Sequence, residues 1–477
     1  MWKALNDFLV TVDNCVWGVP LIVLILCGGI LLSLRMGFVQ FRKLPLAFKY
    51  MFEKEDDGEG EVSSFQALCT ALSATIGTGN IVGVATAVMA GGPGAIFWLI
   101  VAACFGMATK YAEGLLAVKY RTVDEEGHAL GGPFYYIEKG MGKKFKPLAK
   151  LFALFGVCVG LFGIGTFSQV NGISSAVVNF FDPKTQFAVT IPGIGTYSIA
   201  VIIASIVLTL CVALVLLGGL QRIAKVSEFV VPFMAVIYVA CVVVLILCNI
   251  TKVPYAFSVI INGAFNPRAV TGGAVGSIFI VMQKGIARGI FSNESGLGSA
   301  PIAAAAAKTK EPVRQGLVSM TGTFIDTIII CTMTGLSIVL TGAWQVKGLE
   351  GVQVTNYAFT HGLPIPARLA SFLLMLCLVF FAFTTILGWD YYSERCLEYL
   401  VGKKEPILKA FRYLYILCVF AGPYMSVSAV WTIADIFNGL MAIPNMIAIY
   451  ALNGEIVGET KDYFRKRVLG KLAPAND

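Results

Sequence analysis

Long apolar segments follow one another along almost the whole of this 477-residue chain. A helix needs about 20 apolar residues to cross the hydrocarbon core of a bilayer. Segments of this kind can be drawn eleven times, at roughly 17–35, 65–90, 94–118, 148–180, 197–217, 225–249, 271–298, 314–342, 366–399, 407–427 and 430–452. Because every backbone polar group needs a partner inside a bilayer, such segments fold as helices. The sequence therefore predicts an all-α polytopic membrane protein.

The composition agrees with a membrane protein and argues against other classes. Charged residues make up 13% of the chain and hydrophobic residues 57%, whereas about 25% of the residues in a soluble domain are charged. The formal net charge of +8 does not indicate a nucleic-acid partner, because the basic residues are spread over many loops. Most of the 12 cysteines lie in apolar segments and lack zinc-type spacing, so we interpret them as small packing residues.

The N-terminal residues have two interpretations. Within residues 1–14, the apolar side chains Trp2, Leu5, Phe8 and Leu9 favour a short amphipathic helix on the membrane surface. A disordered terminus is the alternative. The segment has neither a basic region nor a small-residue cleavage site, so we expect no cleaved signal peptide.

Lysine and arginine residues are concentrated in alternate loops. With the N-terminus outside, the loops on the inner side hold 27 of the 36 Lys and Arg residues and those on the outer side hold six. Cytoplasmic loops of membrane proteins are enriched in these residues. We therefore predict eleven spans in a bacterial-type plasma (inner) membrane, with the N-terminus outside and the C-terminus in the cytoplasm.

The eleven spans divide into one N-terminal span and two sets of five. Since five is odd, the two sets enter the membrane in opposite directions, as in transporters built from inverted repeats. The first span of each set is interrupted by glycines, and we expect the second break within 276–289. The predicted organisation is an amphipathic segment (1–14), an extra span with a cytoplasmic loop (15–60), a first repeat (61–250), a second repeat (251–455) and a cytoplasmic tail (456–477).

The interruption of the span 65–90 is the first candidate site. Residues 73–83 read Ser-Ala-Thr-Ile-Gly-Thr-Gly-Asn-Ile-Val-Gly. Glycine in a membrane helix commonly serves close packing, which is the alternative interpretation. Thr75, Thr78 and Asn80 add polar atoms within a turn and a half, which favours a binding site.

An unwound segment at membrane depth has free backbone groups of both signs. Amides near Gly77 and Gly79, at the start of a half-helix, suit a carboxylate. The upstream half ends in free carbonyls around Ser73 and Ile76, which suit a hard cation. The break is therefore a candidate site for a carboxylate and a small cation together.

Two other spans carry polar side chains at mid-depth. The hydroxyls of Thr384 and Thr385 either bond back to carbonyls of their own helix or supply oxygen ligands to the cation. Trp389 either packs in the core or forms a wall of the substrate pocket. Gln169 needs a partner at this depth, and a neighbouring helix and a substrate are both candidates.

Charged side chains also occur within the spans. A charge inside a membrane is a functional candidate by default, with snorkelling or a structural ion pair as the alternative. We expect four of these residues to lie towards the inner ends of their spans, where an ion-pair gate would sit; they are Arg288, Glu294, Asp390 and Glu394. The full set is Lys110, Glu113, Lys284, Arg288, Glu294, Asp326, Asp390 and Glu394.

Motifs for enzymatic chemistry are missing from the sequence. There is no Gly-x-Ser-x-Gly elbow, no Walker A sequence and no His-Glu-x-x-His. The two histidines, His128 and His361, both lie in predicted loops. We therefore expect that the protein is not an enzyme.

Several blocks of this sequence resemble the alanine or glycine:cation symporter family. The most specific block is Arg-Gly-Ile-Phe-Ser-Asn-Glu at 288–294, followed by glycines at 296 and 298 and a proline at 301. The resemblance covers roughly residues 15–455. The other blocks are 74–83, 91–95, 110–113, 131–133 and Trp-Asp-Tyr-Tyr at 389–392.

The resemblance implies a leucine-transporter-like fold with one extra N-terminal helix. It places the substrate at the first break, near Thr75, Gly77, Thr78, Gly79 and Asn80. It adds pocket walls from other spans, namely Phe167, Gln169, Phe279, Gln283, Thr385 and Trp389. It assigns sodium to the carbonyls of Ser73 and Ile76 and the hydroxyls of Thr384 and Thr385. The places of Phe279 and Gln283 depend on where the second helix breaks.

The expected function is sodium-coupled symport of small neutral amino acids, alanine and glycine, into the cell by alternating access. A proton-coupled or cation-independent transporter of the same fold, a glutamine-preferring sodium symporter and, less favoured, a channel are the alternatives. The expected partners are the amino acid, sodium and the lipid bilayer, without nucleic acid or an obligate protein partner. Sodium is the coupling ion, and we expect no other cofactor.

Overall fold

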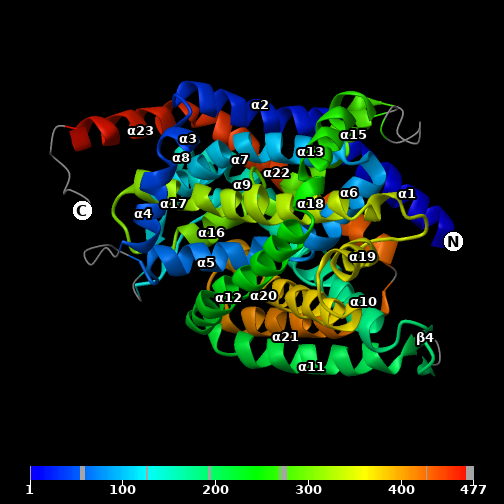
Figure 1. Cartoon of the computed structure of the whole chain (residues 1–477). Helices are drawn as coiled ribbons and strands as arrows, with labels where there is room; N and C mark the ends of the chain where they lie inside the picture. Colours follow the sequence, from blue (N-terminus) through cyan, green and yellow to red (C-terminus); the bar gives the residue numbers. More distant parts are fainter. Residues whose placement is uncertain are drawn as a thin grey trace.

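Helices make up most of the structure, a computed structural model that describes residues 2–53, 60–124, 127–191, 195–267, 270, 277–425 and 427–468. The long helices lie roughly side by side and run across the molecule in Figure 1. The described strands form two short antiparallel hairpins, β1 (Thr122–Val123) with β2 (Ala129–Leu130) and β3 (Ala188–Ile191) with β4 (Gly195–Ser198). The predicted all-α class is confirmed.

Ten of the eleven predicted spans correspond to described helices that are long and apolar enough to cross a membrane, when a bent pair is counted as one. The eleventh, 271–298, begins with residues 271–276, which lie outside the described residues. The helices before the two repeats are α1 (Trp2–Val16), α2 (Val19–Arg35), α3 (Val39–Arg42) and α4 (Leu44–Phe52).

The long helices after α4 fall within the two predicted repeats, 61–250 and 251–455. The first contains α5 (Ser64–Thr75), the π-helical η1 (Gly79–Gly83), α6 (Val84–Gly91), α7 (Gly94–Lys119), α8 (Pro133–Gly140), α9 (Lys146–Phe162), α10 (Phe167–Phe181), α11 (Ile199–Leu216) and α12 (Gly219–Cys248). After α13 (Val253–Phe265), the second contains α15 (Ile278–Asn293), α16 (Ala300–Ala304), α17 (Pro312–Thr323), the π-helical η4 (Phe324–Cys331), α18 (Thr332–Leu340), α19 (Val352–Gly362), α20 (Ala367–Val401), α21 (Glu405–Ala421) and α22 (Val427–Ala451). The short helices α8 and α19 each follow the second span of their repeat and pack on the next long helix.

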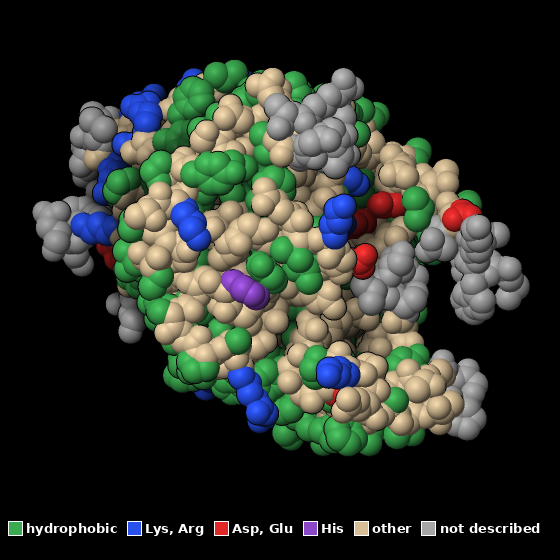
Figure 2. All heavy atoms as spheres, turned by 45° about the vertical axis from the view of Figure 1, so that its right-hand side comes forward, with side chains coloured by type: hydrophobic (Ala, Val, Ile, Leu, Met, Phe, Trp, Pro, Cys, Tyr) green, Lys and Arg blue, Asp and Glu red, His purple; other side chains and the backbone are tan. Residues whose placement is uncertain are grey.

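The two ends of the bundle differ in charge. We call the end with α4, α8 and the last helix, α23 (Asn453–Val468), the basic end; it lies on the left of Figure 1. The opposite end, on the right, carries α1, α19 and the β3–β4 hairpin. Figure 2 is turned towards this opposite end, where charged side chains are few and scattered. The spatial separation follows the alternation of Lys and Arg between loops in the sequence.

The outer helices α11 and α12 present apolar side chains away from the bundle. Leu210, Leu214, Phe229 and Val236 are all 60–73% exposed. Exposed apolar residues in such numbers are typical of a surface that faces lipid. The polar residues of the chain are instead gathered within the bundle, around the breaks in the helices.

The first break follows a well-defined helix. The Ser63 side chain and Gln66 form a reciprocal capping box at the start of α5, which fixes where the helix begins. The helix ends at Thr75, and the axis changes direction by 52° between it and the segment Gly79–Gly91. The predicted interruption of this span is confirmed.

Candidate functional site

The amides of the first break are held by two side-chain oxygens. The Gly77 N–H donates to Asn80 Oδ1 at 2.8 Å, and the Thr78 N–H donates to Gln169 Oε1 at 2.9 Å. Gln169 lies in the first turn of α10 and is fully buried. The structure thus brings together Gly77, Thr78, Asn80 and Gln169, four of the residues predicted for the substrate.

Close packing at Gly77 explains why the break contains glycine there. A Cβ atom at this position would lie 2.5 Å from Thr385 Oγ1 and 2.8 Å from Gln169 Oε1. These distances are shorter than van der Waals contact, so a larger residue would displace the side chains of Thr385 on α20 and Gln169 on α10. The glycine therefore serves close approach of three helices as well as the break itself, and the packing and binding interpretations are compatible.

Two buried polar atoms at the break have no hydrogen-bond partner within the described part of the chain. They are the amide nitrogen Nε2 of Gln169 and the hydroxyl oxygen of Thr78. Both residues are fully buried. An unpaired polar group in a protein interior costs about 1–3 kcal/mol, and such atoms call for an explanation such as a bound ligand.

The side of the break predicted to bind the cation is formed by α5 and α20. Thr385 Oγ1 donates to the Ile76 carbonyl at 3.2 Å and to the carbonyl one turn earlier in its own helix at 3.0 Å. Ser73 is fully buried on α5, and its hydroxyl donates to the Thr70 carbonyl at 2.7 Å. A Cβ atom at Gly388 would lie 2.9 Å from Ser73 Oγ, so the two helices are in direct backbone contact here.

Thr384 lies elsewhere on α20. Its hydroxyl donates to the carbonyls of Phe380 and Phe381 at 3.1 and 3.0 Å and lies 3.6 Å from the sulfur of Met234 on α12. These are the back-bonds of the alternative interpretation. The structure therefore brings Thr385, and not Thr384, into hydrogen-bond contact with the first break.

An acidic residue that we did not assign to the site lies next to the first break. Asp326 is fully buried in η4. Its Oδ1 accepts a hydrogen bond from Asn80 Nδ2 at 2.7 Å, and its Oδ2 accepts one from Ser292 Oγ at 2.9 Å. Asp326 was among the charges flagged within the spans, but nothing in the sequence relates it to Asn80, because the two are 246 positions apart.

The second break lies later in the sequence than predicted. The helix α15 is continuous over Ile278–Asn293, so the break expected within 276–289 is wrong for the described part of that range. Glu294, Gly296 and Gly298 have φ angles of 55°, 90° and 83°, which a right-handed helix cannot contain. The glycines before the break pack against α7 instead: a Cβ atom at Gly285 would lie 2.2 Å from the Ala95 carbonyl oxygen.

Charged side chains hold the second break. Lys110 Nζ donates to the Asn293 carbonyl at 2.8 Å, at the end of α15. The Gly296 N–H donates to Glu113 Oε1 at 3.0 Å. Trp389 Nε1 donates to Glu294 Oε1 at 2.8 Å. The buried charges on α7 are therefore partners of the broken backbone.

The remaining predicted residues are dispersed. Phe279 is in the first turn of α15 and 43% exposed, and Gln283 Nε2 donates to the Trp17 carbonyl at 3.3 Å. The structure does not bring either to the first break, because the second helix breaks more than ten residues later. Phe167 is buried at the start of α10. Thr75 is buried and faces a small cavity of about 10 Å³ that Lys110 also lines.

The expected group of inner-end charges is divided between separate places in the structure. Arg288 forms an ion pair of 2.8 Å with Asp435 on α22, whose carbonyl accepts a hydrogen bond from Trp17 between α1 and α2. This pair lies near the junction of α1 and α2, so Arg288 does not form one group with Glu394. Glu394 pairs with Arg412 at the basic end, with two contacts of 2.5 Å, and its role in a gate stays a prediction.

The arrangement of helices and breaks defines a class of protein. A solved structure, that of MhsT in complex with L-phenylalanine, matches this chain with a TM-score of 0.59 at 11% identity, over 84% of this chain and 93% of that one. The protein has the leucine-transporter-like fold predicted from the sequence. Broken spans that meet at buried polar groups also occur in transporters built from inverted repeats.

The sequence comparisons identify the family. The model of the sodium:alanine symporter family matches residues 2–476. The sodium/alanine symporter AgcS of Methanococcus maripaludis is 47% identical over 95% of this chain and 96% of its own length. The probable sodium/glutamine symporter GlnT of Bacillus subtilis is 35% identical over 99% of this chain and 93% of its own length. The chain belongs to the sodium:alanine symporter family and is a multi-pass membrane transporter that couples amino-acid transport to sodium, not an enzyme.

Proposed function

We propose that this protein carries alanine and glycine into the cell together with sodium, by alternating access at the first break. The observation that carries the proposal is the pair of unpartnered atoms, Gln169 Nε2 and Thr78 Oγ1, beside amides that already point at side-chain oxygens. A substrate carboxylate at this place would accept hydrogen bonds that the described residues leave unmade.

The amides of the break provide the carboxylate site. A carboxylate oxygen that entered would replace Gln169 Oε1 as the acceptor of the Thr78 N–H, which lies 2.9 Å away. The carboxylate would gain binding free energy from charge-assisted hydrogen bonds, which are about twice as strong as neutral ones. The start of the second half-helix, at Gly79, adds a favourable dipole.

Sodium would bind between α5 and α20. The Ile76 carbonyl and the Thr385 hydroxyl already meet at 3.2 Å, and both are oxygen ligands of the kind that hard cations prefer. Ser73, which is buried on α5 beside Gly388 of α20, contributes its carbonyl to the same site. Because the two helices must be in contact to form this site, the bound ion favours their closed arrangement.

The choice of substrate rests on the relatives. The identity to AgcS, which is named for alanine, is 47%, and the identity to GlnT, which is named for glutamine, is 35%. The higher identity favours alanine and the equally small glycine, and glutamine is the second candidate. The N-terminus would lie outside and the basic end in the cytoplasm, since Lys and Arg residues are enriched on the cytoplasmic side.

Radiolabelled uptake into proteoliposomes tests the proposal. We expect alanine and glycine uptake when sodium is outside, and uptake close to background when sodium is replaced by choline. Glutamine should compete weakly. Equal alanine uptake in choline would contradict sodium coupling, and faster uptake of glutamine than of alanine would contradict the substrate assignment.

A further inference from the structure

A polar cavity opens at the basic end, further along α20 than the first break. Its volume is about 300 Å³, and it lies between the start of α12, the end of α20 and the start of α21. Since a water molecule occupies about 30 Å³ of the liquid, the cavity has room for a hydrated ion. Its wall holds five carboxylates and three Lys or Arg side chains, so its formal charge is negative.

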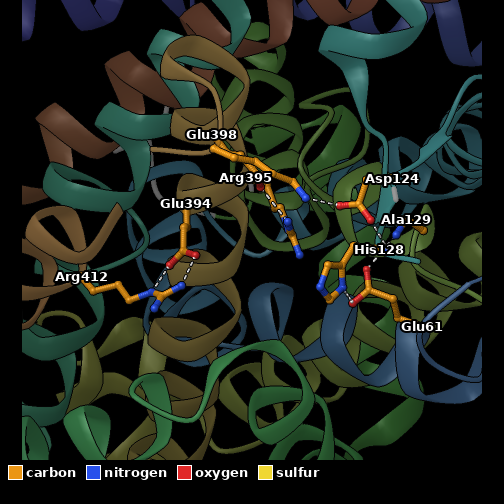
Figure 3. A network of polar contacts seen from close by, with 9 residues as sticks. Glu61, Asp124, His128, Ala129, Glu394, Arg395, Glu398 and Arg412 are labelled. Carbon is orange, nitrogen blue, oxygen red and sulfur yellow. Dashed lines mark hydrogen bonds and ion pairs between the residues drawn. The ribbon is translucent and has the colours of Figure 1, made fainter. Parts of the chain in front are cut away.

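Most charges on this wall are already paired. Arg412 contacts both carboxylate oxygens of Glu394 at 2.5 Å, and Arg395 contacts Glu398 at 2.6 Å. Figure 3 shows Arg412 reaching Glu394, and Glu61 held by His128 and the Ala129 N–H. These partners neutralise or satisfy the carboxylates that they contact, so they leave little capacity for a further ligand.

Asp390 differs from the other acids of the wall. Its side chain is only 2% exposed, and its Oδ1 has no hydrogen-bond partner within the described part of the chain. Arg412, on the neighbouring helix α21, is engaged by Glu394. An unpaired polar atom in a protein interior costs about 1–3 kcal/mol, and a cation in contact with the carboxyl group would offset this cost.

The cavity lies close to the proposed sodium site along the same helix. Asp390 follows Thr385 by five residues on α20, which corresponds to about 7.5 Å along the helix axis. The start of α12 on the cavity wall belongs to the helix that packs against both α5 and α20. An ion that left the contact between α5 and α20 towards the basic end would therefore come within reach of Asp390.

We propose that Asp390 forms a second sodium site, which faces the cavity at the basic end and which the ion occupies after it leaves the site at Thr385. The proposal rests on the proposed sodium coupling and orientation. Water in the cavity completes the coordination of the ion, as hard cations commonly retain several waters. The two sites act in sequence, so sodium on the cytoplasmic side refills the site at Asp390 and slows net uptake.

The experiment compares alanine uptake by right-side-out membrane vesicles that are loaded with graded sodium concentrations. Uptake by the wild type should fall as the internal sodium concentration rises. In Asp390→Asn we expect the half-inhibitory internal sodium concentration to rise roughly tenfold, since a contacting charge is removed from a partly hydrated site. The half-saturating external sodium concentration should change less than about twofold, because the variant leaves the Thr385 site intact.

Matched variants separate the outcomes. Asp462→Asn removes an exposed carboxylate of α23, paired with Arg465 outside the cavity, and should behave as wild type. If Asp390→Asn does not fold, Asp390→Glu, which retains the charge one methylene further out, should give a smaller shift in the same direction. An unchanged half-inhibitory internal sodium concentration in both Asp390 variants would overturn the inference, as would a change confined to the pH dependence of uptake. Wild-type uptake without external sodium dependence would instead contradict the proposed function.

Discussion

Two neighbouring threonines on α20 have different surroundings although they look alike in the sequence. The Thr385 hydroxyl crosses to the Ile76 carbonyl of α5, whereas the Thr384 hydroxyl bonds back within α20. Successive residues of a helix differ by about 100° in direction, which is enough to turn one hydroxyl to the break and the other to α12. The sequence suggested both as sodium ligands and could not choose between them.

Replacement of Thr385 by alanine should weaken sodium binding. The variant loses one oxygen ligand and the link to Ile76, and we expect the half-saturating sodium concentration for alanine uptake to rise roughly tenfold, or about 1.4 kcal/mol. Thr384→Ala is the matched control, since it removes a hydroxyl that contacts carbonyls of α20 and the Met234 sulfur but not the first break. Uptake should be measured over a range of external sodium concentrations. Equal shifts in the two variants would contradict the role of Thr385.

Asp326 illustrates what a single sequence leaves hidden at the residue scale. A carboxylate in an apolar span is a visible signal, yet its partners Asn80 and Ser292 belong to two other spans. Only the packing of the broken helices brings the three together. The residues of the first break itself could be found because they are contiguous in the sequence.

At the scale of elements, the two breaks differ in how precisely the sequence predicts their positions. In the first, three glycines and an asparagine fall together within 77–83, and the break occurs there. In the second, glycines are spread over 285–298, and those within α15 serve packing against α7. The break itself is fixed by left-handed backbone at Glu294, Gly296 and Gly298, of which only the glycines are visible as candidates.

The packing of the first break predicts the effect of a single methyl group. Gly77→Ala would place a Cβ atom 2.5 Å from Thr385 Oγ1 and 2.8 Å from Gln169 Oε1, so both side chains would have to move and the proposed sodium and carboxylate sites would be displaced together. We expect folded protein with alanine uptake lowered by on the order of a hundredfold. Gly83→Ala in the same π-helical segment is the control, because its nearest new contact is 4.0 Å away. Uptake and size-exclusion profiles of both variants check this expectation, and normal transport by Gly77→Ala would refute it.

The second break depends on a single buried lysine of α7. Lys110 donates to the Asn293 carbonyl and lies within electrostatic range of Glu113, Glu294 and Asp326. In Lys110→Met the carbonyl loses its partner and the carboxylates lose a compensating charge, so the free energy of unfolding should fall by about 3 kcal/mol.

Thermal denaturation of the purified protein measures this loss. Lys119→Met on the same helix is the comparison, because Lys119 pairs with Glu455 and Glu459 at the surface, where ion pairs contribute about 0–1 kcal/mol. A midpoint for Lys110→Met equal to that of Lys119→Met would show that the second break does not need the charge.

For the whole molecule, the sequence predicts the architecture well because its signals are cumulative. Span length and Lys and Arg placement are summed over hundreds of residues, and one misplaced end changes little. The helix pattern and the leucine-transporter-like fold agree with this reading. Side-chain positions such as those of Phe279 and Arg288 depend instead on the exact point at which a helix ends and on tertiary contacts. Each of these is a single local feature, so an error of a few residues changes the prediction.

The orientation of the whole molecule can be tested with fusions. We expect green fluorescent protein attached after residue 468 to fluoresce in bacterial cells, because the basic end would face the cytoplasm. Alkaline phosphatase fused at the β3–β4 hairpin, at the opposite end, should be active, since it requires an oxidising compartment. The inverse pattern of the two reporters would reverse the proposed orientation.

The contact at Gly388 bears on how tightly the two solutes are coupled. Ser73 and Ala74 lie so close to this glycine that a methyl group would overlap both, and no water-filled gap of that width exists between the two helices there. Sodium bound at the proposed site beside Ile76 would then escape between these helices only when α5 separates from α20. Such a contact would limit an uncoupled sodium leak, because sodium could cross without the amino acid only through the same helix separation that a transport cycle requires. A bulky residue at position 388 would hold α5 and α20 apart, and we expect it to allow sodium to cross without the amino acid.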